Sequence, residues 1–134
     1  MNNMHDRCSQ ETYREEYGKR IMVVDDDKKI GVLLRDILRS YGFIVNICES
    51  GAQAYDCVTT GDFDYIITDY DMPGMNGLEL TAKFREKNRD TVVIGMSGQD
   101  MSMQFLHAGA NDFLQKPFDP DRLGLMMDGG DIPA

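Results

Sequence analysis

Residues 21–24 form a short, uninterrupted run of apolar side chains that ends abruptly in three aspartates at 25–27. Such a run is typical of a β-strand that is buried on both faces. Apolar side chains then recur at helical spacing over residues 30–41, and Gly42 follows where a helix would end. This segment therefore predicts a fully buried strand that leads directly into a helix packed on the sheet.

The same alternation of strand and helix patterns continues along the chain. Further strands are predicted at 43–48, 63–68, 91–96 and 112–115, and further helices at 52–59, 75–87, 100–107 and 120–127. Strands that alternate regularly with helices predict an α/β fold with right-handed crossovers. We therefore expect a doubly wound, five-stranded parallel sheet that is covered by helices on both faces.

The remaining segments set the expected limits of this domain within the 134 residues. Residues 1–19 mix charged and polar side chains without sustained periodicity, so we expect a flexible N-terminal extension, with a short added helix as the alternative. The domain is expected at 20–128, followed by a C-terminal tail at 129–134. No apolar run approaches the length of a membrane span, and residues 1–20 contain no apolar stretch like that of a secretory signal. A cytoplasmic protein without membrane contact is therefore expected.

The formal net charge of the chain is −9, and its basic residues form no stripe. Nucleic acids attract positively charged surfaces, so direct binding of DNA or RNA is not expected. An acidic excess by itself usually indicates only a well-hydrated surface. In this chain, however, several acids coincide with the ends of predicted strands.

Polar side chains follow four of the predicted strands at the point where each strand ends. Asp25 and Asp26 follow the first strand, Asp69 the third, Ser97 the fourth and Lys116 the fifth. Ligands of open α/β sheets bind beyond the carboxyl ends of the strands, where the strand order reverses. We therefore expect these side chains to form one site.

The carboxylates of this predicted site would repel one another unless a cation lay among them. Magnesium fits an all-oxygen site better than zinc, because the three cysteines show no Cys-x-x-Cys spacing and neither histidine lies at a strand end. Asp26 and Asp69 are the expected direct ligands, and Asp25 is expected to act through water. In a simpler interpretation the acids only cap the following helices, but this does not explain Ser97 and Lys116 at the neighbouring strand ends.

A carboxylate in such a site can attack a phosphoryl donor and form an acyl phosphate if the charge of the transferred group is offset. Magnesium and the ammonium of Lys116 would supply that offset, and the hydroxyl of Ser97 would donate a hydrogen bond to a phosphoryl oxygen. The loop at 70–77 contains a Pro-Gly and an Asn-Gly pair, which are typical of turns. Its backbone groups could reach the metal and the phosphate.

Four segments carry a family resemblance, at residues 21–27, 69–77, 96–98 and 113–118. Together they resemble the receiver domain of two-component response regulators, and in particular the chemotaxis-type single-domain receiver. The resemblance implies a flavodoxin-like (βα)5 fold with strand order 2-1-3-4-5. It also implies that a sensor histidine kinase or a phosphotransfer protein phosphorylates Asp69, and that a downstream protein target reads the result.

The resemblance also implies a set of contacts at the site. The implied magnesium ligands are the side chains of Asp25, Asp26 and Asp69 and the backbone carbonyl of Asp71. The implied contacts of the phosphoryl group are Lys116, Ser97 and the backbone amide of Gly98.

The implied response is a switch. Ser97 would move toward the phosphoryl group and Phe113 would rotate inward, which alters the face formed by the fourth helix, the fifth strand and the fifth helix. Phosphotransfer and dephosphorylation would be self-catalysed, so the chain is not expected to be an enzyme in any other sense. The last predicted helix is short, which argues against a strong dimer on this face and leaves a weak homodimer open.

Two positions depart from the family or leave a property open. Gly98 stands where the family usually has alanine, which should loosen the loop without removing the amide. Asp71 occupies a position that in the family tunes the hydrolysis of the acyl phosphate, so the lifetime of the phosphate is left open.

Three alternatives remain. A haloacid-dehalogenase-like phosphatase also forms an aspartyl phosphate and uses an Asp-x-Asp motif, which residues 69–71 imitate, but that motif follows the first strand rather than the third. A docking module of the same fold that is never phosphorylated would have no use for the acid cluster. We expect a stand-alone receiver, and the alternative is a fragment of a longer regulator.

Overall fold

The computed structural model describes residues 18–60 and 62–127. The predicted tail at 129–134, and all but the last two residues of the predicted extension at 1–19, lie outside the described residues. The strands are β1 (Arg20–Val24), β2 (Ile44–Cys48), β3 (Tyr65–Asp69), β4 (Val92–Ser97) and β5 (Asp112–Gln115). The helices are α3 (Lys28–Ser40), α4 (Gly51–Thr60), α5 (Gly77–Arg85), α6 (Ser102–Ala108) and α7 (Pro120–Met127).

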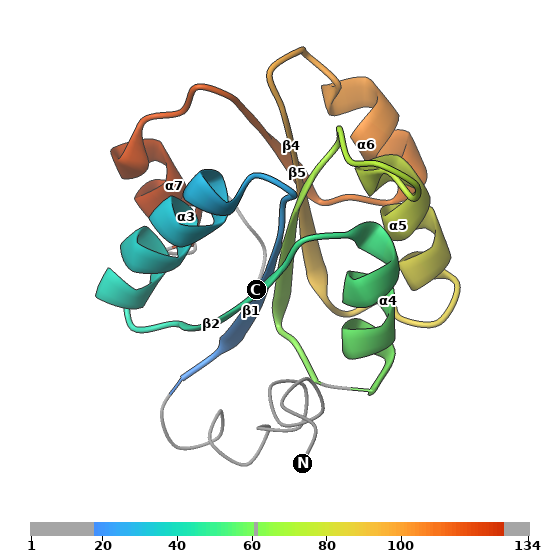
Figure 1. The fold of residues 1–134 in the computed structure, drawn as a ribbon, viewed down its shortest axis with the longest axis horizontal. Helices are drawn as coiled ribbons and strands as arrows, with labels where there is room; N and C mark the ends of the chain where they lie inside the picture. Colours follow the sequence, from blue (N-terminus) through green and yellow to red (C-terminus); the bar gives the residue numbers. More distant parts are fainter. Residues whose placement is uncertain (1–17, 61, 128–134) are drawn as a thin grey trace.

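The strands form one parallel sheet in the order β2-β1-β3-β4-β5. Helices α3 and α7 cover one face of this sheet, and α4, α5 and α6 cover the other (Figure 1). The chain runs outward from β1 to β2 and then crosses back to β3, so the strand order reverses between β1 and β3. The predicted doubly wound α/β fold and its strand order are confirmed.

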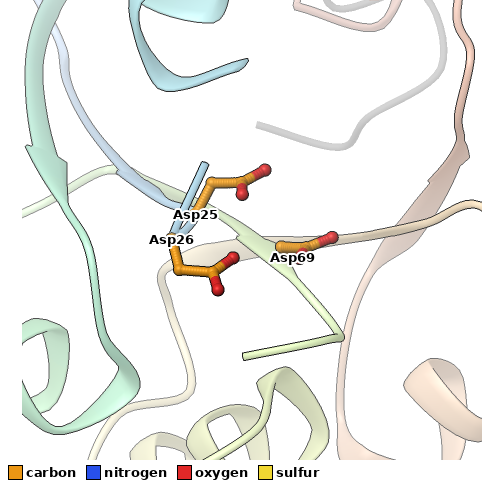
Figure 2. A group of neighbouring side chains, drawn as sticks. All are labelled: Asp25, Asp26 and Asp69. Atoms are coloured by element: carbon orange, nitrogen blue, oxygen red, sulfur yellow. The ribbon is translucent and has the colours of Figure 1, made fainter. Parts of the chain in front are cut away.

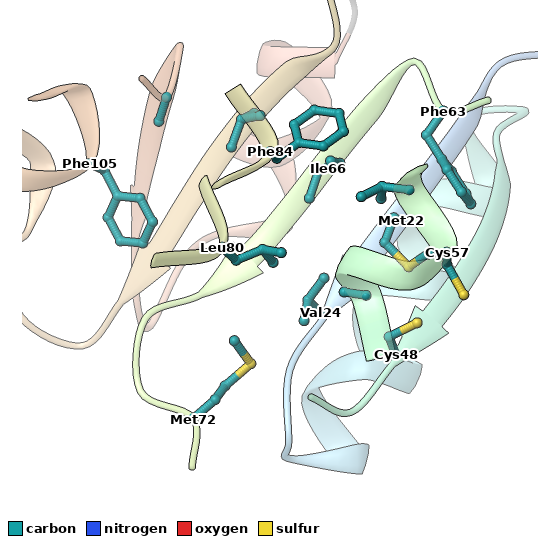
Figure 3. Close-up of a cluster of buried hydrophobic side chains, with 14 residues drawn as sticks. Met22, Val24, Cys48, Cys57, Phe63, Ile66, Met72, Leu80, Phe84 and Phe105 are labelled. Atoms are coloured by element: carbon teal, nitrogen blue, oxygen red, sulfur yellow. The ribbon is translucent and has the colours of Figure 1, made fainter. Parts of the chain in front are cut away.

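The apolar run at 21–24 is explained by two cores, one on each face of the sheet. Ile21 and Val23 belong to the core beneath α3 and α7, whereas Met22 and Val24 belong to the core beneath α4, α5 and α6. Successive side chains of a strand point to opposite faces, so in a strand covered on both faces neighbouring apolar residues enter different cores. Figure 3 shows the second core, in which helices and strands contribute interleaved side chains.

Local capping decides where two of the helices begin. The side chain of Asp27 accepts a hydrogen bond from the backbone amide of Lys29 at 2.9 Å and so caps α3. Asn76 caps α5 and forms a capping box with Glu79. This box starts α5 at Gly77 rather than at residue 75, so the predicted helix at 75–87 is shorter in the structure.

Within residues 18–60 and 62–127, none of the helices combines the length and the apolar character that a membrane crossing would need.

Candidate functional site

The predicted acids meet at the carboxyl end of the sheet, where the strand order reverses. Asp25 directly follows β1 and Asp69 is the last residue of β3, and these strands are neighbours. Both side chains are buried, with relative exposures of 1% and 6%. The backbone amide of Asp25 is held by the carbonyl of Cys48 at 3.0 Å, which fixes the start of the loop against β2.

Asp26 completes a cluster of carboxylates with Asp25 and Asp69. One oxygen from each residue lies within 4.8 Å of the others, and Figure 2 shows the three side chains close together at the ends of β1 and β3. Asp26 is exposed, so the cluster opens to solvent on its side. Three carboxylate oxygens at this spacing could bind a metal, and an all-oxygen donor set suits a hard divalent cation.

Lys116 lies between the two buried carboxylates. Its Nζ donates to Asp69 Oδ1 at 2.9 Å and to Asp25 Oδ2 at 3.0 Å. The backbone amide of Lys116 donates to the carbonyl of Ser97 at 2.8 Å, which ties the end of β5 to the end of β4. Lys116, which follows β5, therefore reaches the carboxyl ends of both β3 and β1.

Burial and charge set the electrostatics of this cluster. Burial raises the pKa of Asp69, and the negative charges of Asp25 and Asp26 raise it further, whereas the hydrogen bond from Lys116 acts in the opposite direction without cancelling them. Burial lowers the pKa of Lys116, but its bonds to Asp69 and Asp25 outweigh burial, so the net pKa is raised. The ammonium therefore stays charged, and the ionised form of Asp69 is disfavoured in the folded protein.

The predicted hydroxyl and loop residues line an open pocket of about 510 Å³ above the cluster. Ser97 is buried, and its Oγ accepts a hydrogen bond from the backbone amide of Gln99 at 3.1 Å. Gly98 is exposed at the rim, and its carbonyl accepts from the side chain of Gln115 at 3.5 Å. Asp71 is also exposed and lines the same pocket. The structure thus brings Asp25, Asp26, Asp69, Asp71, Ser97, Gly98 and Lys116 together at one opening.

Phe113 is the one predicted site residue that lies outside this pocket. It is half-buried in β5, and its ring centroid lies 5.8 Å from that of Phe105. Sequence reasoning did not single out Phe105, which is fully buried and contacts Gly95. A glycine inside an otherwise apolar strand often marks a close approach by another group, so Gly95 was the signal that could have found it.

Comparisons with known proteins agree on the kind of domain. The family model described as "Response regulator receiver domain" matches residues 21–128. The transcriptional regulatory protein CusR of Escherichia coli K12 is 31% identical over 102 residues, which cover 74% of this chain and 45% of CusR. The chain thus spans about half the length of this relative, and the likeness concerns that part alone.

Two solved structures resemble the fold closely. The Francisella response regulator 1452 receiver domain superposes with a TM-score of 0.78 at 30% identity, covering 83% of this chain and 94% of that one. The response regulator TrrA of Thermotoga maritima, solved in complex with Mg²⁺ and BeF, gives a TM-score of 0.77 at 31% identity, covering 82% and 96%.

Proposed function

The chain belongs to the response regulator receiver domain family of two-component systems, and we propose that it accepts a phosphoryl group on Asp69 with Mg²⁺ bound beside it. The proposed donors are a sensor histidine kinase or a phosphotransfer protein. The observation that carries the proposal is the position of Lys116 Nζ within hydrogen-bond distance of both Asp69 and Asp25, in a pocket open to solvent.

The proposed step is attack of an Asp69 carboxylate oxygen on the phosphorus of a phosphohistidine. An O–P bond forms as the P–N bond breaks, and the imidazole leaves with the electron pair and takes up a proton. Lys116 orients the carboxylate through Oδ1 before the reaction and stabilises the charge on a phosphoryl oxygen during it. Phosphoryl transfer requires little covalent chemistry from the protein, so catalysis consists mainly of positioning the reactants and stabilising charge.

Magnesium fits the acid cluster on charge and on donor chemistry. Its proposed ligands are the side chains of Asp25, Asp26 and Asp69 and the backbone carbonyl of Asp71. When bound, the ion would neutralise part of the charge that gathers around the phosphoryl group. The complex of the similar TrrA receiver with Mg²⁺ and BeF supports this assignment.

The proposed response begins at Ser97. Its Oγ holds the amide of Gln99, and turning the hydroxyl toward a phosphoryl group, beside the amide of Gly98, would release this bond. The loop that leads into α6 would then be freed at its first turn. We propose that a downstream protein reads the altered face of α6, β5 and α7, and that the exchange takes place in the cytoplasm.

Phosphorylation by small donors tests the proposal directly. Acetyl phosphate or phosphoramidate is added, with and without Mg²⁺, to wild type, Asp69→Asn and Asp36→Asn. The mass of each intact protein is then measured by mass spectrometry. Asp36 is an exposed acid on α3, so Asp36→Asn is the matched control. We expect one added phosphoryl group in wild type and Asp36→Asn, dependent on Mg²⁺, and none in Asp69→Asn. No adduct in wild type together with no binding of beryllofluoride by calorimetry would refute the proposal.

The same proteins separate this function from that of a phosphatase. We propose that phosphotransfer and dephosphorylation are self-catalysed and that the chain has no other enzymatic activity. Sustained hydrolysis of p-nitrophenyl phosphate by wild type, lost in Asp69→Asn, would instead indicate a haloacid-dehalogenase-like phosphatase.

A further inference from the structure

Helix α6 is attached to the sheet through one buried side chain, Phe105. The other large apolar side chains of α6, those of Met103 and Leu106, are 66% and 50% exposed. Helix α5 beside it buries both Leu80 and Phe84. The position of α6 on the sheet therefore depends on where the ring of Phe105 lies.

The ring of Phe105 lies in a slot formed by two glycines. A Cβ on Gly95 of β4 would collide with the ring at Cγ and both Cδ atoms, and a Cβ on Gly77 would lie 3.1 Å from Cζ. Protein interiors are close-packed, so a ring can approach a strand this closely only where the strand lacks a side chain. Figure 3 shows the ring pointing from its helix toward the strands.

This slot is connected to the candidate site at three points. Gly77 packs directly against the carbonyl oxygen of Asp69. The ring of Tyr70, the next residue, stands edge-on to Phe105 at 6.5 Å and 82°. Gly95 lies two residues before Ser97 in β4, so both positions belong to the same face of the strand.

Phe105 also fills the space that Phe113 would need. Gly95 and Phe113 are direct partners in the register of β4 and β5, so both lie on the same face of the sheet. An inward rotation of Phe113 would carry its ring over Gly95, where the ring of Phe105 already lies. Phe113 instead lines a depression on the surface, and its ring is tilted by 36° against that of Phe105.

We propose that Phe105 is the positioning residue through which a change at Asp69 moves α6, and that Phe113 follows this movement rather than leading it. The inference rests on the proposed function. A shift of Ser97 toward a phosphoryl group displaces the end of β4 and with it the floor of the slot at Gly95. The ring follows the slot, and α6 follows its ring.

Amide hydrogen exchange of peptides from α6, with and without beryllofluoride and Mg²⁺, tests the inference. The variants are Phe105→Leu and Phe113→Leu, and the matched control is Phe84→Leu, another buried phenylalanine of the same core. We expect beryllofluoride to change exchange in α6 about threefold or more in wild type, Phe113→Leu and Phe84→Leu, and to leave Phe105→Leu almost unchanged. Calorimetry should show that Phe105→Leu still binds beryllofluoride. Should this variant fail to fold, Phe105→Met keeps the apolar volume without the ring and serves the same test.

The outcomes separate this inference from the function on which it rests. A response that is lost in Phe113→Leu overturns the inference, and so does a response that persists in Phe105→Leu. Binding of beryllofluoride by wild type without any change in α6 overturns it as well. Wild type that fails to bind beryllofluoride overturns the proposed function, and the inference with it.

Discussion

The two ends of the β-sheet are built in opposite ways. At the carboxyl end, Asp25, Asp26 and Asp69 form a cluster in which the Lys116 ammonium contacts Asp25 and Asp69, and burial raises the pKa of Asp69. At the amino end, hydrogen bonds join polar groups from neighbouring elements. Arg85 donates to the carbonyl of Gly109 at 2.8 Å and to Asn111 Oδ1 at 2.7 Å, and that same oxygen accepts from the buried amide of Val93 at 2.8 Å.

This difference indicates that the amino end of the sheet stabilises the folded state, whereas the acid cluster at the carboxyl end destabilises it. Buried polar groups stabilise a protein when each finds its partner, and like charges brought together destabilise it. The hydrogen-bonded network joins α5, the end of α6 and the starts of β4 and β5, so it holds together the two strands whose other ends carry Ser97 and Lys116. The acid cluster is then an unfavourable arrangement that a cation or a transferred group can relieve.

The largest expected effect is at the amino end. Asn111→Ala removes the acceptor of the Val93 amide and of Arg85 Nη2, so we expect the free energy of unfolding to fall by about 2 to 3 kcal/mol. Urea denaturation measures this loss. Asn111→Asp keeps an acceptor oxygen in the same place and should restore most of it. A loss below about 0.5 kcal/mol would show that the network contributes little.

Magnesium should act only at the carboxyl end. At about ten times its dissociation constant, the ion should raise the free energy of unfolding of wild type by about 1.4 kcal/mol. Asp26→Asn should lose most of this gain, whereas Asp36→Asn should keep it. Sodium chloride at equal ionic strength controls for screening of the surface charge. An equal gain in Asp26→Asn would place the ion elsewhere.

Asp69→Asn should make the metal-free protein more stable. The folded state raises the pKa of Asp69, so the unfolded chain releases this proton first as the pH rises. Wild type therefore loses stability from about pH 4, near the pKa of an unfolded carboxyl, until the native pKa is passed. Above that point the variant should keep an advantage of about 1 kcal/mol, and below pH 4 little of it should remain. Denaturation at pH 4 and pH 7.5 measures both values, and a variant less stable than wild type at pH 7.5 would contradict the expectation.

Much of the acid cluster at the carboxyl end could be predicted from the sequence, because the topology of the sheet determines where its residues lie. Asp25, Asp69 and Lys116 follow buried runs, and the carboxyl ends of parallel strands must meet at one edge of the sheet. Their positions directly after strand-forming runs therefore predicted that they lie close together in the fold. The roles given to these residues in phosphotransfer remain predictions, because position alone does not establish a reaction.

The orientation of α6 is much harder to predict from the sequence. The apolar residues Met103, Phe105 and Leu106, together with Met101 just before the helix, allow more than one face to turn toward the sheet. Only the missing side chain at Gly95 selects Phe105, and that choice depends on which strand lies beneath the helix. The start of α5 was misplaced for a related reason, since the capping box of Asn76 and Glu79 takes precedence over the apolar pattern.

The smallest expected effect tests which groups at the carboxyl end of the sheet lower the free energy of unfolding: the charged side chains alone, or the neighbouring cap of α5 as well. Asn76→Ala removes the side chain that accepts from the amide of Glu79 at 2.9 Å, so we expect a loss of about 0.7 kcal/mol, measured by urea denaturation. Glu79→Gln keeps the other half of the box and should cost less. If the cost of the carboxyl end lies in the charges alone, the effects of Asn76→Ala and Asp69→Asn should add in the double variant. A coupling larger than about 0.5 kcal/mol would show instead that the cap of α5 and the acid cluster are one unit, joined through the contact of Gly77 with the Asp69 carbonyl.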